Sequence, residues 1–218
     1  MNNHKQIKGK LRNYFLTIEK NSKNLQKLEN IEENLDLGMK YIQMILPLKK
    51  ITKEAENRLK ENVEHNILRA KIREVKEKDL EILMNLYNKA WLTSHEPFRA
   101  LGLNDIKSLY NDQNLTIFIA NVYGLDTGFL ILDFEGSKKE YGIIVAMGVI
   151  PRFQRKGLGK IMALAAWEFF KKRNIVELRS EVYVDNKVSY NFLKSLGFED
   201  NGVKVYKSED FDLGISNT

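Results

Sequence analysis

Apolar residues recur every three or four positions through the first 70 residues, as they do along one face of an α-helix. They fall into groups at positions 11–18, 25–31, 35–46 and 59–67. Ser22 and Asp36 are suitable N-caps, and Pro47 is expected to end or kink a helix. Residues 1–69 are therefore predicted to form a helical extension of three or four helices, packed as a small bundle or as an arm.

After residue 70 the pattern changes to short apolar strands that alternate with amphipathic helices. Strands at 115–122 and 128–134, joined by the turn residues 123–127, predict a hairpin. The run 142–150 is almost entirely apolar, which is typical of a strand buried on both faces. The other expected elements are strands at 71–75, 177–184 and 202–207 and helices at 80–91, 159–172 and 186–196. Residues 70–218 are therefore predicted to form one α/β domain with a mixed sheet.

Composition places the chain among globular proteins, because 43% of its residues are hydrophobic and 29% are charged. No apolar run is long enough to span a bilayer, and residues 1–5 lack the apolar core of a signal peptide, so we expect a cytoplasmic protein without membrane contact. The absence of cysteine excludes disulfides, thiolate metal sites and a cysteine nucleophile. No His, Asp or Glu cluster has metal-ligand spacing, so no metal is expected.

The formal net charge of +6 is unevenly distributed. Residues 1–70 hold 14 Lys and Arg against 9 Asp and Glu, a balance of +5, whereas the rest holds 21 against 20. A solvated basic surface explains this excess, and so does an acidic partner. Because no basic tract is interleaved with aromatic residues, nucleic acid is the less favoured partner. The helical extension could equally form a homodimer contact or cover an open face of the α/β domain.

The segment that carries the most chemistry is the loop Gln154–Gly159, between the strand at 142–150 and the following helix. The first-turn amides of a helix have no acceptor within the helix, and they lie at its positive dipole end. Gly157 and Gly159 let the backbone approach a ligand, while Arg155, Lys156 and Lys160 add positive charge. The loop is thus suited to bind an anion such as a pyrophosphate, although two glycines in a tight strand–helix turn would give the same pattern.

Two motifs resemble the signatures of the GNAT family of N-acetyltransferases. Val149, Pro151, Gln154, Gly157 and Gly159 match the fixed positions of the family's V-x-P-x-x-Q/R-x-x-G-x-G/A motif. The segment 186–198, which begins with Asn, has Ser three residues later and ends in Gly-Phe, resembles the second signature. The resemblance covers about residues 70–207 and leaves residues 1–69 outside.

This resemblance implies a sheet that splays between the strands at 142–150 and 177–184, with acetyl-CoA bound in the split. A β-bulge commonly helps to open such a split. Backbone groups of Met147 and Val149 would pair with the pantetheine amides, as an added strand does. The pyrophosphate would lie against the amides of Gln154, Arg155, Lys156, Gly157, Leu158, Gly159 and Lys160. Asn186 and Ser189 would line the cofactor arm.

The residues that would carry out proton transfer depart from the family pattern. Leu193 stands where many members have a tyrosine acid, and Ile143 stands where many have a glutamate base. The candidate substitutes are Tyr190, one helical turn before Leu193, Glu181 on the strand at 177–184, and Glu140 beside the strand at 142–150. His95, in the loop expected to border the acceptor site, has a suitable intrinsic pKa for a base. The alternative interpretations are ordinary packing for Tyr190, a structural role for Glu181, and a solvated surface position for Glu140 and His95.

The sequence therefore predicts an N-acetyltransferase that moves an acetyl group from acetyl-CoA to a primary amine by direct transfer in a ternary complex. The identity of the amine acceptor does not follow from the sequence. Leu193 and Ile143 also fit an acyl-CoA-binding regulatory module with little turnover. A third interpretation is an interaction protein that is recruited through its basic helical extension.

Overall fold

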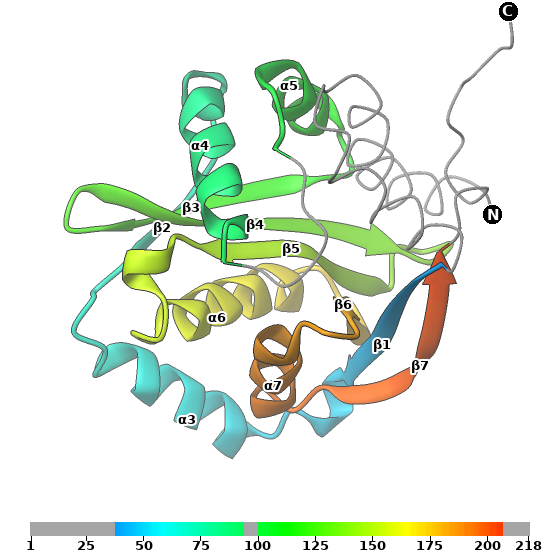
Figure 1. Cartoon of the computed structure of the whole chain (residues 1–218). Helices are drawn as coiled ribbons and strands as arrows, with labels where there is room; N and C mark the ends of the chain where they lie inside the picture. The colour runs from blue at the N-terminus through cyan, green and yellow to red at the C-terminus, as the bar shows by residue number, and fades with distance from the viewer. Residues whose placement is uncertain (1–37, 94–99, 207–218) are drawn as a thin grey trace, which may run out of the picture.

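The computed structural model describes residues 38–93 and 100–206 as a seven-stranded sheet with helices on both faces (Figure 1). The strands are β1 (Met39–Pro47), β2 (Lys71–Glu74), β3 (Thr116–Val122), β4 (Leu125–Glu135), β5 (Tyr141–Val149), β6 (Glu177–Tyr183) and β7 (Glu199–Tyr206). The α-helices are α3 (Lys53–Glu64), α4 (Leu80–Trp91), α5 (Leu103–Asn111), α6 (Leu158–Lys171) and α7 (Lys187–Ser195). Short 3-10 turns are η2 (Leu48–Lys50), η3 (Glu77–Asp79) and η4 (Pro151–Phe153).

The strands follow the order β2-β3-β4-β5-β6-β1-β7, and every neighbouring pair is antiparallel except β5 and β6. The parallel pair is joined by α6, because parallel strands need a crossover connection. The predicted α/β fold with a mixed sheet is confirmed.

Two hydrophobic cores lie on opposite faces of the sheet. Helices α4 and α5 pack on the face formed by β3, β4 and β5, around Leu83, Tyr87, Ile106 and Phe129. Helices α6 and α7 pack on the other face, where Trp167 and Phe170 meet side chains of β1, β4 and β6. Helix α3 lies beside α6 on this second face (Figure 1). The sheet is therefore covered on both faces where its strands are most apolar.

The helical interpretation of positions 35–46 is wrong from Met39 onward, because Met39–Pro47 forms β1. This strand lies inside the sheet, pairing with β6 on one side and with β7 on the other. A short apolar run fits a helical and a strand pattern about equally well, and the open edges of β6 and β7 decide between them. The helix predicted around positions 59–67 is confirmed as α3, whereas the predictions for residues 1–37 lie outside the described residues.

The hairpin of β3 and β4 turns more tightly than its sequence indicated. Only Tyr123 and Gly124 connect the strands, and both have positive φ, at 52° and 84°. Turns with two left-handed residues match the twist of the flanking strands. Leu125 and the two residues after it, expected in the turn, belong to β4.

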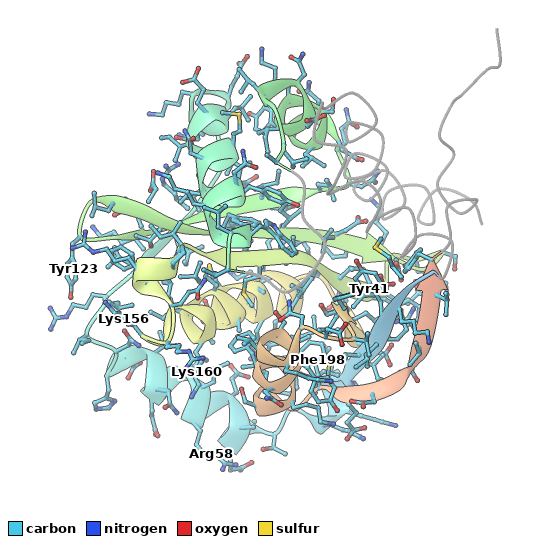
Figure 2. The ribbon with its side chains drawn as sticks, viewed as in Figure 1. Tyr41, Arg58, Tyr123, Lys156, Lys160 and Phe198 are labelled. Carbon is cyan, nitrogen blue, oxygen red and sulfur yellow. The ribbon has the colours of Figure 1, made fainter. Side chains whose placement is uncertain are left out.

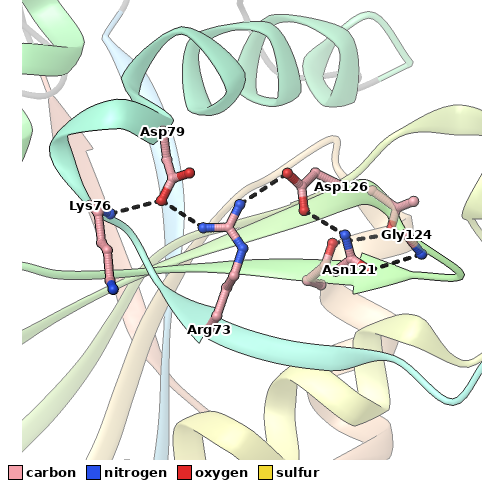
Figure 3. Close-up of polar contacts among 8 residues, drawn as sticks. Arg73, Lys76, Asp79, Asn121, Gly124 and Asp126 are labelled. Atoms are coloured by element: carbon pink, nitrogen blue, oxygen red, sulfur yellow. Dashed lines mark hydrogen bonds and ion pairs between the residues drawn. The ribbon is translucent and has the colours of Figure 1, made fainter.

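A polar network ties this hairpin to β2 and to the start of α4 (Figure 3). Arg73 on β2 donates to Asp79 at 2.6 Å and to Asp126 on β4 at 3.0 Å. Asp79 also accepts from the backbone N–H of Lys76, and Asp126 accepts from Asn121. These bonds stabilise the ionised carboxylates, and with them the edge of the sheet.

Helix α3 is held to α6 by an ion pair near the C-terminal end of α6. Lys171 Nζ lies 2.9 Å from Glu56 Oε2, and Lys60 lies 2.7 Å from Glu56 Oε1. Hydrogen bonds from Lys60 and Lys171 hold the pKa of the Glu56 carboxyl at about 2, below its usual 4.5. The Glu56 side chain is only 13% exposed, so this pair is less screened by solvent than an ordinary surface pair.

We expect Glu56→Gln to lower the free energy of unfolding at pH 7 by roughly 1 kcal/mol, because two cations lose their partner. The depressed pKa means that the Glu56 contribution is complete above about pH 4.5 and is lost as the pH falls towards 2. Urea unfolding of both proteins between pH 7 and pH 3 measures the difference, which should shrink as the pH falls.

Glu61→Gln on the same helix is the matched control, since the Glu61 carboxylate makes no ion pair within residues 38–93 and 100–206. A Glu56→Gln deficit that stayed constant between pH 7 and pH 3 would contradict the ion-pair explanation.

Candidate functional site

The sheet splits between β5 and β6. The two strands pair only from Tyr141 and Glu177 to Ile144 and Ser180, although β5 continues to Val149 and β6 to Tyr183. The register between β4 and β5 shifts at the same level, which places a bulge at Val145. A bulge bends its strand, so it turns β5 away from β6 where their pairing stops. The predicted split and bulge are both present.

The open edge of β5 presents backbone polar groups to the split. Ile150 N donates to Thr127 O at 2.9 Å, so the backbone groups of Ile150 face the neighbouring strand β4. Because alternate residues of a strand direct these groups to opposite sides, Met147 and Val149 direct theirs towards β6. At the closed end, the Ser180 hydroxyl donates to Ile144 O at 3.1 Å and satisfies that carbonyl. The split therefore offers hydrogen-bonding groups to an extended ligand.

The loop after β5 delivers the chain to the N-terminus of α6, close to the end of the split. Gly157 is the N-cap of α6 and has φ of +85°, and Arg155 also has a positive φ of 58°. Within the described part of the chain, the backbone N–H groups of residues 155–159 donate to no protein acceptor. Five successive amides without a protein acceptor, at the positive end of a helix dipole, are suited to bind an anion.

Gln154 anchors this loop to the strand before it. Its side-chain amide donates to Val149 O and to Thr93 Oγ1, each at 2.9 Å. The Val149 carbonyl is therefore occupied from within the protein, and its N–H is the group left for a ligand. The side chain of Gln154 thus shapes the loop, whereas the sequence placed Gln154 among residues in contact with the cofactor.

Both glycines of the loop have packing reasons as well. A Cβ added to Gly157 would lie 2.1 Å from Asn66 Nδ2, and one added to Gly159 would lie 3.1 Å from the Phe192 ring. Gly157 also needs its left-handed conformation, which costs other residues roughly 1–2 kcal/mol. The glycines let α7 and the chain after α3 approach the mouth of α6.

The loop and the first turn of α6 carry three cationic side chains, those of Arg155, Lys156 and Lys160, and all three are exposed. Lys156 and Lys160 lie on the side of α6 that faces α3 (Figure 2). The Lys156 ammonium lies 5.7 Å from the centre of the Phe153 ring. Positive charge beside free amides strengthens the attraction for an anion.

Asn186 and Ser189 lie at the N-terminal end of α7, Asn186 as its N-cap and Ser189 in its first turn. Asn186 is buried, and its side-chain oxygen accepts from Ser189 N at 3.1 Å as the helix N-cap. Neither side chain has a described contact with the loop 154–160. Their place in the cofactor arm stays a prediction.

The three candidate catalytic residues are not brought together. The Tyr190 hydroxyl donates to Asp200 on β7 at 2.9 Å, two strands beyond β6, and this carboxylate raises the pKa of Tyr190. The Glu140 carboxylate accepts from Lys138 N, and hydrogen bonds from turn amides lower the pKa of Glu140. Glu140 therefore lies at the closed end of the split, within its own turn.

Glu181 is the candidate that lies at the split itself. It is the first residue of β6 beyond the last pair with β5, and it faces away from the α6 side of the sheet. The Tyr206 hydroxyl donates to Glu181 at 2.8 Å. Leu193 and Ile143, at the family positions for an acid and a base, are buried apolar side chains.

A tyrosine cluster beside Glu181 was not predicted from the sequence. Tyr41 lies with its ring centre 5.5 Å from Tyr183 and 5.6 Å from Tyr206, in edge-to-face geometry. Tyr41 reaches this position because β1 pairs with both β6 and β7. Since positions 35–46 fitted a helix, no sequence signal placed Tyr41 beside Tyr183 and Tyr206, which lie 142 and 165 positions further along the chain.

His95 lies outside the described residues. Among residues 38–93 and 100–206, no group of three His, Cys, Asp or Glu side chains could hold a metal ion. The same part of the chain contains no helix with the length and apolar character needed to cross a bilayer.

A family model described as the acetyltransferase (GNAT) family matches residues 80–198 of this chain. An uncharacterized N-acetyltransferase of Methanocaldococcus jannaschii is 32% identical over 141 residues, which cover 61% of this chain and 62% of that protein. The chain thus spans less than two thirds of this relative. A spermidine N(1)-acetyltransferase of Thermoplasma acidophilum is 27% identical over 129 residues, covering 58% of this chain and 73% of that protein.

Among solved structures, the aminoglycoside N-acetyltransferase AAC(6')-Iy in complex with a bisubstrate CoA analogue has a TM-score of 0.51. It is 22% identical, and the match covers 61% of this chain and 92% of that protein. At this level of identity the likeness concerns the fold.

We expect Gly157→Ala to destabilise the protein by more than Gly124→Ala, a matched control with nearly the same φ. Both substitutions meet the cost of a left-handed residue, roughly 1–2 kcal/mol, but only at Gly157 does the new Cβ meet Asn66. Around Gly124 nothing lies within 4 Å of the added atom. Urea unfolding of the two variants gives the difference, and equal losses would show that Asn66 makes room at no cost.

Proposed function

The chain belongs to the GNAT acetyltransferase family, and we propose that it moves an acetyl group from acetyl-CoA to a primary amine. The transfer is direct and takes place in a ternary complex. The observation that carries the proposal is the split between β5 and β6, which ends at the free amides of residues 155–159. A strand edge followed by an anion site matches a ligand with an amide-bearing arm and a pyrophosphate.

The residues present fit acetyl-CoA on chemical grounds. Met147 offers a backbone N–H and a carbonyl to the pantetheine arm, and Val149 offers its N–H. The amides from Arg155 to Gly159 hold the pyrophosphate, with Lys156 and Lys160 beside it. Bound acetyl-CoA supplies a thioester, whose carbonyl carbon is the electrophile of the reaction.

Glu181 is the residue we assign to proton removal. In the reaction the amine nitrogen forms a bond with the thioester carbon, and the carbon–sulfur bond breaks with its electron pair leaving on sulfur. The bound ammonium first gives one proton to Glu181, directly or through a water, which frees the nitrogen lone pair for the attack. The second nitrogen proton passes through solvent to the thiolate. Glu181 suits this role because it lies at the split and because the Tyr206 hydroxyl orients its carboxylate. Tyr190 receives no role, since its hydroxyl is directed to Asp200 on β7, two strands away from the open part of β6.

The acceptor is a cationic amine in this proposal. Two of the similar proteins are a spermidine N(1)-acetyltransferase and an aminoglycoside N-acetyltransferase, and both spermidine and aminoglycosides carry several amines. The Glu181 carboxylate, at the split and beside the half-buried Tyr183, is suited to attract a protonated amine through its charge.

A second candidate function is acyl-CoA binding without turnover. The buried apolar side chains of Leu193 and Ile143 favour this second function, because neither can donate or accept a proton. Release of free CoA in the presence of an amine separates the two functions. The chain contains no cysteine, so a thiol reagent detects only the CoA that the reaction releases.

We expect Lys160→Glu to raise the dissociation constant for acetyl-CoA several-fold, on the order of 1 kcal/mol, because it reverses a charge in the first turn of α6. Isothermal titration calorimetry at 0.1 M salt measures this change. Lys172→Glu, the same change just beyond the other end of α6, is the control and should bind like the parent protein. If the parent protein does not bind acetyl-CoA at all, the proposed function is wrong.

We expect Glu181→Gln to lower kcat by roughly a hundredfold or more while the KM for acetyl-CoA changes little, because only proton transfer is lost. Glu140→Gln is the control and should keep the parent kcat. Both are measured by CoA release over a panel of polyamines, aminoglycosides and peptides. Equal kcat in the two variants would remove Glu181 from the mechanism.

A further inference from the structure

One side chain of the connection between α3 and β2 donates a hydrogen bond to the anion-binding loop. Asn66 Nδ2 donates to Lys156 O at 3.0 Å, across 90 positions of sequence. Asn66 Oδ1 accepts from Leu68 N at 2.8 Å, so both ends of the side-chain amide are engaged. Leu68 is in turn buried against Leu158 and Ile161 of α6. Asn66 is thereby fixed in position while it holds the loop.

The carbonyl that Asn66 binds determines the direction of a free amide. In a trans peptide the C=O and the N–H of one peptide unit point to opposite sides. Asn66 draws the Lys156 carbonyl towards α3, so the N–H of Gly157 points away from α3. This N–H belongs to the five amides of residues 155–159 that donate to no protein group in the described chain.

The loop and Asn66 are also matched in shape. Gly157 has φ of +85°, and the space where its Cβ would lie is filled by Asn66 Nδ2 at 2.1 Å. Any other residue at 157 would therefore push Asn66 away as well as strain its own backbone. The glycine and the asparagine together hold one conformation of the 156–157 peptide.

Helix α3 gives this contact a rigid support. Its other end is held to α6 by the ion pair of Glu56 with Lys171. The N-cap Thr52 accepts from Ala55 N, and the C-terminal His65 N donates to Glu61 O, so the helix is capped at both ends. Asn66 is therefore carried by an element fixed at the start and at the end of α6.

We propose that Asn66 is a positioning residue for the pyrophosphate of acetyl-CoA. It acts through the Lys156 carbonyl, holding the Gly157 N–H towards the ligand before the ligand arrives. The inference rests on the proposed function, and it assigns a role to a segment outside residues 80–198, which match the family model. A preformed donor binds more tightly than one that must be ordered on binding.

The test compares Asn66→Ala and Asn66→Ser with Asn62→Ala in binding to CoA and to pantetheine, which has no pyrophosphate. Asn62 lies one turn earlier on α3, and its side chain donates only to Arg58 O of its own helix in the described chain. A serine at position 66 can still accept from Leu68 N but is too short to reach Lys156 O. It therefore separates the loop contact from the local turn.

We expect both Asn66 variants to raise the dissociation constant for CoA about five- to tenfold and to leave that for pantetheine unchanged. Asn62→Ala should bind both ligands like the parent protein. In turnover, the KM for acetyl-CoA should rise while kcat stays constant.

Other outcomes overturn the inference in distinguishable ways. If the parent protein binds CoA and both Asn66 variants bind it equally well, Asn66 has no positioning role and the proposed function stands. If Asn66→Ser weakens the binding of CoA and the binding of pantetheine to the same extent, the effect is a general loss of structure. If the parent protein binds neither ligand, the proposed function itself fails.

Discussion

The parting of β5 and β6 is the constraint on which the rest of this molecule depends. Two parallel strands that stop pairing after Ile144 and Ser180 leave backbone groups exposed inside an otherwise continuous sheet. The bulge at Val145 directs β5 away, and the Ser180 hydroxyl satisfies the carbonyl at the point of separation. Buried polar groups require partners, so this geometry is stable only with water or a ligand in the split. The fold thus forms a binding edge from the backbone, with few side chains needed.

The chain before residue 70 contributes to this arrangement on both sides of the split. Strand β1 lies between β6 and β7, which supports the outer half of the sheet and brings Tyr41 next to Tyr183 and Tyr206. Helix α3 runs beside α6 and contacts its C-terminal end through Glu56, while Asn66, in the connection after α3, contacts the loop at its N-terminal end. One half of the site is therefore shaped by a strand in the sheet, and the other half by a helix outside it.

Cofactor binding and proton transfer rest on different kinds of interaction. The anion site consists of backbone amides whose direction is set by peptide planarity, by glycine conformations and by the Gln154 and Asn66 side chains. Proton transfer depends instead on side chains, and these differ in the bonds they already make. Tyr190 donates to Asp200 on β7 and Glu140 lies in its own turn at the closed end, whereas Glu181 lies where the pairing of β5 and β6 ends and accepts from Tyr206.

The sequence by itself determined the local features: the strand–loop–helix around Gln154–Gly159, the hairpin and the alternation of strands and helices after residue 70. The individual strands, turns and helices are encoded in consecutive residues, through glycine conformation, helix ends and apolar periodicity. Only the tertiary structure decided that Met39–Pro47 is a strand, because its run fits either element until β6 and β7 supply partners. The directions of the Asn66 and Tyr190 side chains could not be predicted from the sequence either, because each side chain hydrogen-bonds a residue distant from its own helix or loop. Local patterns specify elements, whereas contacts between distant segments specify where the side chains point.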